Sequence, residues 1–170
     1  MKHLNTNRSQ PLNVFNNDSL RPPGGGADSI ERKRSVDNKT IAGVFEEMGN
    51  ILDILGVDFF RVNAYRKAAL TIGNLSADLR RMVQEHPYEI DKIPGIGKAL
   101  KEKIIELVNS GKCAEHEKIK RGFPPGLLEM MHLRSVGPKK VKLFYYKLKI
   151  TTLKDLKEAA ENHKLRELEG

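Results

Sequence analysis

The spacing of apolar residues after Val36 is the feature that most constrains the fold. From this residue to the end of the chain, apolar side chains recur every three or four positions, and the runs are broken by glycines and prolines. This period matches one face of an α-helix, which has about 3.6 residues per turn. The only strand-like alternation is Leu148, Ile150, Thr152, which is too short to build a sheet. The sequence therefore predicts an all-α fold.

The turn signals divide the apolar pattern into nine short helices. Asp37 or Asn38 can cap the first one, because their side chains accept hydrogen bonds from first-turn amides. Ser76 is the expected cap of the third helix, and Thr152 with Asp155 is the expected cap pair of the eighth. The apolar faces of the first three expected helices run over 41–55, 59–75 and 79–83, and the other expected helices cover about 98–110, 114–121, 125–133, 138–148, 152–161 and 163–169.

Composition divides the chain into three parts. Residues 1–35 are rich in Asn, Ser, Pro and Gly, hold isolated apolar residues, and carry six basic and three acidic side chains. Such a segment buries too little apolar surface to offset its ordering entropy, so we expect a disordered basic tail. Residues 36–112 and 113–170 are each expected to form a small helical bundle. Bundles of this size are marginal alone, and we expect the two to pack on each other or on a partner outside this chain.

Charge and composition exclude several classes of protein. The chain has 170 residues with 30 Lys and Arg against 22 Asp and Glu, a net charge of +8 that indicates an anionic partner. It lacks a run of about 18 apolar residues and an apolar signal segment at its start, so we expect a cytoplasmic, nucleoid-associated protein without membrane contact. We also expect the protein to be a monomer. Its single cysteine, Cys113, excludes an internal disulfide and a multi-cysteine zinc site. With 6% aromatic residues and no Trp, a base-stacking platform is not expected.

The most specific local motif is the segment 93–100, Ile-Pro-Gly-Ile-Gly-Lys-Ala-Leu, which is typical of a helix-hairpin-helix. Gly95 and Gly97 let the backbone turn tightly between two helices, while Ile96 fills the core. The loop amides and the first amides of the next helix then point outward, where they form an anion site. Three lysines surround it: Lys98, Lys101 and Lys103.

Other glycine-rich motifs do not fit this segment. A phosphate-binding loop needs glycine at Lys92 and Ser or Thr at Ala99. A dinucleotide-binding fingerprint needs glycine at Leu100 and a preceding strand. The remaining alternative is a tight helix-helix turn without a ligand, and the clustered lysines favour an anion site over it.

The pattern recurs at residues 133–141, Leu-Arg-Ser-Val-Gly-Pro-Lys-Lys-Val. Ser135 replaces the first glycine, which puts the hairpin geometry in doubt because serine tolerates a positive φ less well than glycine. Pro138 suits the first position of a helix. We expect five residues of this segment to contact DNA: Ser135, Gly137, Lys139, Lys140 and Lys142. Six basic residues and no acidic one lie between positions 134 and 149: Arg134, Lys139, Lys140, Lys142, Lys147 and Lys149.

Three stretches together resemble the N-terminal part of family X DNA polymerases, the relatives of DNA polymerase beta, with bacterial and archaeal members the nearest. They are Asn63–Ala69, the hairpin Pro94–Gly97, and Val136–Lys140. The resemblance covers about 38–170. It implies a lyase-like helix-hairpin-helix domain followed by a second, fingers-like hairpin domain that grips duplex DNA beside a gap.

The polymerase palm domain of this family has no counterpart here. No Asp-x-Asp pair occurs, so we expect no metal bound by side chains, and Mg²⁺ only if a palm is supplied elsewhere. The resemblance also implies a monovalent cation at the hairpin-loop carbonyls. Residues 165–170 resemble the lead-in to a third hairpin, so the chain is expected to be a fragment.

The resemblance assigns roles in the first bundle. Lys103 aligns with a lysine that forms a Schiff base with the sugar of an incised abasic site, and Tyr65 with a tyrosine of that pocket. Arg61 falls on a phosphate-binding position, and Arg66 is expected to contact DNA. Lys98 and Lys101 could lower the Lys103 pKa, which would make its amine nucleophilic.

Three positions depart from the relatives that carry out the lyase reaction. Those relatives have a histidine at the position of Phe60 and lysines at the positions of Ala99 and Glu115. The negative charge of Glu115 would repel a phosphate. We therefore favour non-sequence-specific binding of gapped, nicked or junction DNA, as the DNA-binding portion of a repair polymerase. A 5′-deoxyribose-phosphate or abasic-site lyase is the alternative. A protein-interaction module is the third possibility, and its signature would be an apolar, exposed hairpin.

Overall fold

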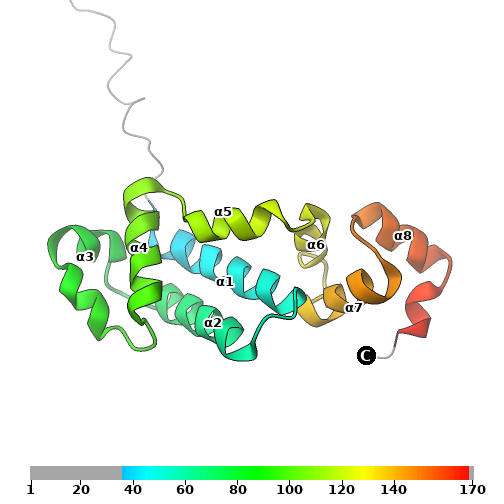
Figure 1. Ribbon diagram of the computed structural model, residues 1–170, viewed down its shortest axis with the longest axis horizontal. Coiled ribbons are helices and arrows are strands. Elements are labelled where there is room, and N and C mark those ends of the chain that lie inside the picture. Colours follow the sequence, from blue (N-terminus) through cyan, green and yellow to red (C-terminus); the bar gives the residue numbers. More distant parts are fainter. Residues whose placement is uncertain (1–35, 169–170) are drawn as a thin grey trace, which may run out of the picture. The chain divides into compact units, whose positions relative to one another are not determined.

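The computed structural model describes residues 36–168, and every regular element in this range is a helix (Figure 1). The prediction of an all-α fold is confirmed. The predicted tail 1–35 lies outside the described residues, as does the end of the predicted third hairpin. The α-helices are α1 Asn38–Ile54, α2 Phe59–Gly73, α3 Leu79–Glu85, α4 Lys98–Ser110, α5 Ala114–Arg121, α6 Pro125–Met130, α7 Pro138–Leu148 and α8 Leu153–Glu161; the 3₁₀-helices are η1 Pro87–Lys92 and η2 Lys164–Glu167.

Side-chain caps set several helix ends. The Asp37 carboxylate accepts a hydrogen bond from the Thr40 amide at 2.8 Å, as predicted for the start of α1. Thr152 and Asp155 form the predicted reciprocal capping box of α8. The prediction for α3 was wrong, because Asp78 rather than Ser76 is its cap. Asp78 directly precedes the first helical residue, so its carboxylate reaches a first-turn amide, 2.9 Å away.

Two short segments differ from the predicted helices. Residues 87–92 form the 3₁₀-helix η1, which apolar periodicity does not reveal because six residues make only two of its turns. The segment expected as a helix over 163–169 is η2, a single 3₁₀ turn of four residues. The sixth predicted helix ends earlier than expected, at Met130.

The first hydrophobic core is built mainly from α1, α2 and α4. The Phe45 and Tyr65 rings meet edge to face, with centroids 5.8 Å apart, where α1 and α2 pack side by side (Figure 1). Ile96 is only 6% exposed and fills this core from the hairpin, as predicted. Other fully buried members are Ile41, Met48, Ile72, Leu79, Ile90 and Ile104.

The second core takes residues from α6, α7 and α8, and also from the end of α1. Ile51 and Ile54 are fully buried in it, although they belong to the helix that opens the first bundle. The helix α1 packs against α2, α5 and α7, so it runs through both cores. The division into 36–112 and 113–170 stays a prediction, but α1 contributes buried residues to both cores.

Gly126 brings α6 against the backbone that precedes α8. A Cβ atom at this position would lie 2.9 Å from Thr152 Cα and 3.2 Å from the Thr151 carbonyl carbon, and nearer still to the Thr151 carbonyl oxygen. Only a residue without a side chain permits this approach.

Within residues 36–168, each helix is too short or too polar to cross a membrane.

Candidate nucleic-acid interface

The first hairpin turns tightly between η1 and α4. Gly95 has a φ of +80°, in the left-handed region that favours glycine, and the Ile96 amide donates to the Ile93 carbonyl at 3.1 Å. Ile96 points into the core, while Gly95 and Gly97 are exposed. The predicted hairpin geometry is therefore present.

The start of α4 has no capping side chain. Its N-cap is Gly97, and in the described part of the chain no hydrogen bond is made by the Gly97, Lys98 or Ala99 amides. In contrast, α1, α2 and α3 each begin with an aspartate that accepts from a first-turn amide. The open amides and the positive end of the helix dipole make the start of α4 an exposed, positively polarised surface.

The second hairpin repeats this geometry before α7. Ser135 has a φ of +65°, close to the value at Gly95, and the Val136 amide donates to the Leu133 carbonyl at 3.1 Å. The doubt about Ser135 was therefore wrong, because the loop forces the serine into the left-handed region at a cost of about 1–2 kcal/mol. Gly137 is the N-cap and has no capping side chain, and Pro138 takes the first helical position as predicted.

The side chains of the predicted lysines differ in their exposure and in their ion pairing. Lys98 at the first loop and Lys139 and Lys140 at the second are exposed. Lys101 instead forms an ion pair, in which its Nζ atom lies 2.6 Å from Asp91 Oδ2. Lys142 is half-buried, and its Nζ lies 3.4 Å from where a Cβ on the neighbouring turn glycine, Gly56, would stand.

Arg66 belongs to α2, yet it lies beside the second hairpin. Its Nη2 atom donates to Asp53 at 2.6 Å and to Asn50 at 3.4 Å. The groove at this point has a volume of about 370 Å³. Its lining residues are Asp53, Arg66, Ser135, Gly137, Pro138, Lys139 and Lys140. Sequence reasoning gave no sign that Arg66 and the second hairpin would meet.

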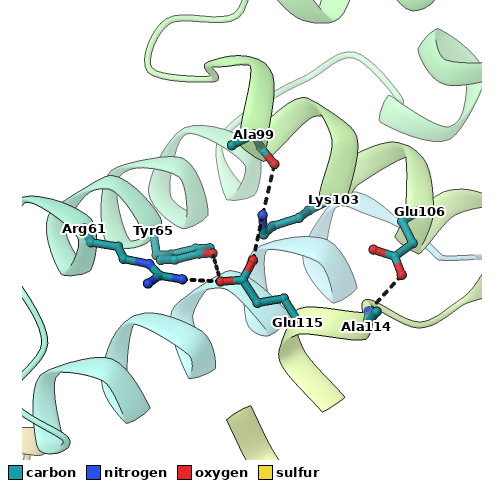
Figure 2. A network of polar contacts seen from close by, with 7 residues as sticks. All are labelled: Arg61, Tyr65, Ala99, Lys103, Glu106, Ala114 and Glu115. Atoms are coloured by element: carbon teal, nitrogen blue, oxygen red, sulfur yellow. Dashed lines mark hydrogen bonds and ion pairs between the residues drawn. The ribbon is translucent and has the colours of Figure 1, made fainter. Parts of the chain in front are cut away.

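Glu115 links the other predicted residues of the first bundle (Figure 2). Its carboxylate accepts hydrogen bonds from the Arg61 guanidinium and, at 3.2 Å, from the Tyr65 hydroxyl. The Lys103 ammonium lies 2.8 Å from the second carboxylate oxygen and donates to the Ala99 carbonyl at 3.2 Å. The structure thus brings Arg61, Tyr65 and Lys103 together around an anionic residue of α5.

The charge of Glu115 governs how its neighbours titrate. Partial burial opposes the charged form of Lys103, but the hydrogen bond and charge of Glu115 outweigh it, so the Lys103 pKa is raised. The expected lowering of this pKa was therefore wrong, because Lys98 is exposed, Lys101 pairs with Asp91, and the nearest charge is negative. Partial burial also opposes the ionised form of Glu115, but Lys103 and Arg61 hold its pKa below the ordinary value.

Two exposed aromatic residues were missed from the sequence. Phe59 and Phe60 are 68% and 80% exposed, and their rings meet edge to face. Phe59 is the first residue of α2 and lies beyond the first core, whereas Val62 and Tyr65 are buried. The low aromatic content could not reveal that two phenylalanines lie together on the surface.

No group of three or more His, Cys, Asp or Glu side chains within residues 36–168 is placed to hold a metal ion. Cys113 is fully buried, and burial raises the pKa of its thiol.

Comparison with known proteins agrees with this geometry. Residues 36–113 match the family model described as a helix-hairpin-helix domain. These residues are a helix-hairpin-helix domain. The chain is also 30% identical over 135 residues to the DNA polymerase/3′-5′ exonuclease PolX of Bacillus subtilis (strain 168). This confirms the resemblance to the family X DNA polymerases.

The match covers 79% of this chain and 23% of the Bacillus subtilis protein. The chain therefore spans about a quarter of the length of that relative. The matching domain, residues 36–113, holds the first hairpin together with Arg61, Tyr65 and Lys103, while the second hairpin follows it.

Proposed function

We propose that residues 36–168 bind DNA through its phosphate backbone at two points, without reading the base sequence, as the DNA-binding portion of a protein related to the family X polymerases. The observation that carries this proposal is the repeated geometry of the two hairpins. Each has a left-handed residue in the loop, a glycine N-cap, and a helix start without a capping side chain.

Phosphate oxygens suit these sites better than other ligands. Backbone amides at a helix start bind an anion by hydrogen bonding and by the helix dipole, and they distinguish no base. Lys98 is exposed at one loop and Lys139 and Lys140 at the other, so each site adds positive charge. The stretch from 134 to 149, which contains the second loop, holds six basic residues and no acidic one, in a chain with a net charge of +8.

The hairpin tips favour DNA over a protein partner. A hairpin that docks protein would present an apolar tip, but Ile96 is buried and Val136 is half-buried. The loops expose mainly glycine, serine, lysine and arginine, and their exposed apolar residues are limited to Pro94 and Leu133, which is 41% exposed. The interaction-module alternative therefore has less support.

The lyase alternative also has little support from the site. A Schiff-base lysine must lose its proton before its amine can attack an aldehyde. The contact with Glu115 favours the charged ammonium of Lys103 and raises its pKa. A preference for gapped or nicked DNA, a monovalent cation at the loop carbonyls, and Mg²⁺ at a separate palm domain rest on the family resemblance alone.

The experiment uses two glycine N-caps that tolerate a side chain. Gly97 has a φ of −82° and Gly137 a φ of −113°, and a Cβ at either position meets no atom within 4 Å. Gly97→Ala with Gly137→Ala should therefore keep the fold while placing a methyl group where each phosphate would approach. Gly122→Ala is the control, since a Cβ there also meets nothing within 4 Å and Gly122 follows α5, outside both hairpins.

Fluorescence anisotropy with a labelled gapped duplex gives the dissociation constant of each variant. We expect the double variant to bind about tenfold more weakly, the factor lost with about one charge-assisted hydrogen bond, and Gly122→Ala to bind as the wild type does. The wild-type affinity should also fall steeply between about 50 and 200 mM salt, because bound phosphates release counterions. Unchanged affinity of the double variant, or affinity independent of salt, would rule out the two-hairpin mechanism.

A further inference from the structure

Glu115 occupies the point where polar groups of two other helices converge. Its Oε1 atom accepts from Arg61 and Tyr65 of α2, and its Oε2 atom lies 2.8 Å from the ammonium of Lys103 on α4 (Figure 2). The same ammonium donates to the Ala99 carbonyl at 3.2 Å. Both carboxylate oxygens are therefore used, and the single negative charge of Glu115 offsets one of the two positive charges that face it.

A phosphate group would use the same three donors. A guanidinium, an ammonium and a phenol hydroxyl all donate to carboxylate and phosphate oxygens alike, and the two charged donors bind them most strongly. The site is recessed around Lys103 and Glu115, whose side chains are 16% and 28% exposed, and it opens at Arg61, whose side chain is 51% exposed. A phosphate at the end of a DNA strand reaches such a site more easily than a diester flanked by sugars on both sides.

Three further features hold the Glu115 carboxylate in place. It is the second residue of α5, where the helix dipole favours a negative charge. The helix itself packs against α1, and its own His116 is buried in that contact. Despite partial burial, Lys103 and Arg61 hold the Glu115 pKa below its ordinary value, so the group is ionised at neutral pH. A phosphate entering this site would have to displace a fixed anion.

We propose that Glu115 is an internal anion that closes this site, so that the protein binds DNA ends without distinguishing a 5′-phosphate from a 5′-hydroxyl. The inference rests on the proposed DNA binding and adds a specificity to it. DNA is held by the two hairpins, while the cluster of Arg61, Tyr65 and Lys103 takes no part in recognising the strand end.

The test compares two glutamates on the same helix. Glu115→Gln removes the negative charge but keeps the size of the side chain. Glu117→Gln makes the same change of charge two residues later, at a side chain that is 54% exposed and lies outside the cluster. Each protein is titrated against two gapped duplexes that differ only in a 5′-phosphate or a 5′-hydroxyl on the downstream strand.

We expect the wild type to bind both duplexes with the same dissociation constant. Glu115→Gln should bind the phosphorylated duplex about tenfold more tightly than the hydroxyl duplex, because about one charge-assisted hydrogen bond becomes available. Glu117→Gln should strengthen both equally. If Glu115→Gln does not fold, as judged by circular dichroism, Glu115→Ala serves as the second variant with the same expectation.

A wild type that already prefers the 5′-phosphate would overturn the inference. So would a folded Glu115→Gln or Glu115→Ala variant that gains no preference, since the carboxylate would then not be what closes the site. Failure of the wild type to bind either duplex would instead refute the proposed function.

Discussion

Gly126→Ala perturbs the contact between α6 and the backbone before α8. The added Cβ would stand 2.9 Å from Thr152 Cα, and the obstructing atoms belong to the backbone. A flexible side chain could move aside, but here a whole segment must shift. The displacement is at least 0.5 Å, the difference between 2.9 Å and the 3.4 Å of an ordinary contact.

The expected cost follows from this displacement. α6 and α8 share the second core, in which Leu127 and Met130 are fully buried, so a shift of α6 disturbs several packed side chains. Overpacking of this kind costs about 1–3 kcal/mol. Replacing glycine by alanine in a helix regains about 0.5–1 kcal/mol of backbone entropy. We therefore expect a net loss of about 0–2.5 kcal/mol, centred on about 1.3 kcal/mol, or about 3–5 °C in Tm at the centre of the range.

Gly43→Ala is the matched control. Gly43 lies within α1, and a Cβ there meets nothing within 4 Å, so the same substitution should stabilise the protein by about 0.5–1 kcal/mol. Thermal and urea unfolding followed by circular dichroism measure both variants. If Gly126→Ala were as stable as the wild type, α6 would not pack on residues 151 and 152 as described.

Three further predictions concern the hairpins and the Glu115 cluster. Lys139→Ala with Lys140→Ala should reduce the slope of log affinity against log salt by about 2, since each lost phosphate contact contributes about 0.9; an unchanged slope would place these lysines outside the interface. Ser135→Gly should raise the free energy of unfolding by at most about 1 kcal/mol, because relief of the left-handed strain exceeds the entropy that glycine loses; a decrease in urea unfolding experiments would contradict the strain. The folded-state pKa of Glu115 lies below its ordinary value of 4.5, so its ion pairs stabilise the protein fully above pH 4.5 and lose this effect as pH falls through the lowered pKa. Glu115→Gln should therefore flatten the acid side of the stability profile, and a profile identical to that of the wild type would show that the ion pairs contribute nothing.

Local features of the sequence predicted most of the helices and both hairpins. Asp37 and the Thr152–Asp155 pair act through atoms within four residues of the helix start, so their capping roles follow from the sequence itself. The turn at Gly95 and Ile96 is equally local. Ser76 failed as a cap because Asp78 competes for the same helix start from two residues closer.

Predictions that depended on the surrounding structure were less successful. Phe59 has the spacing of an apolar face, but it is the first residue of α2, lies beyond the core and is exposed. Ser135 was expected to disturb its loop, but the loop keeps the geometry of the first hairpin and holds the serine in a left-handed conformation. In both cases the surrounding structure, rather than the residue, decided the outcome.

The sequence by itself determined an all-α chain with two hairpins and a positive charge beside them, because helix periodicity, turn residues and charge density are all local. Only the tertiary structure decided which charges meet. Arg61 and Glu115 are 54 positions apart, and Arg66 reaches the second hairpin from α2. Such contacts depend on how the helices pack around α1. The sequence suggested Lys103 as a nucleophile, but the packing of the helices pairs its ammonium with Glu115.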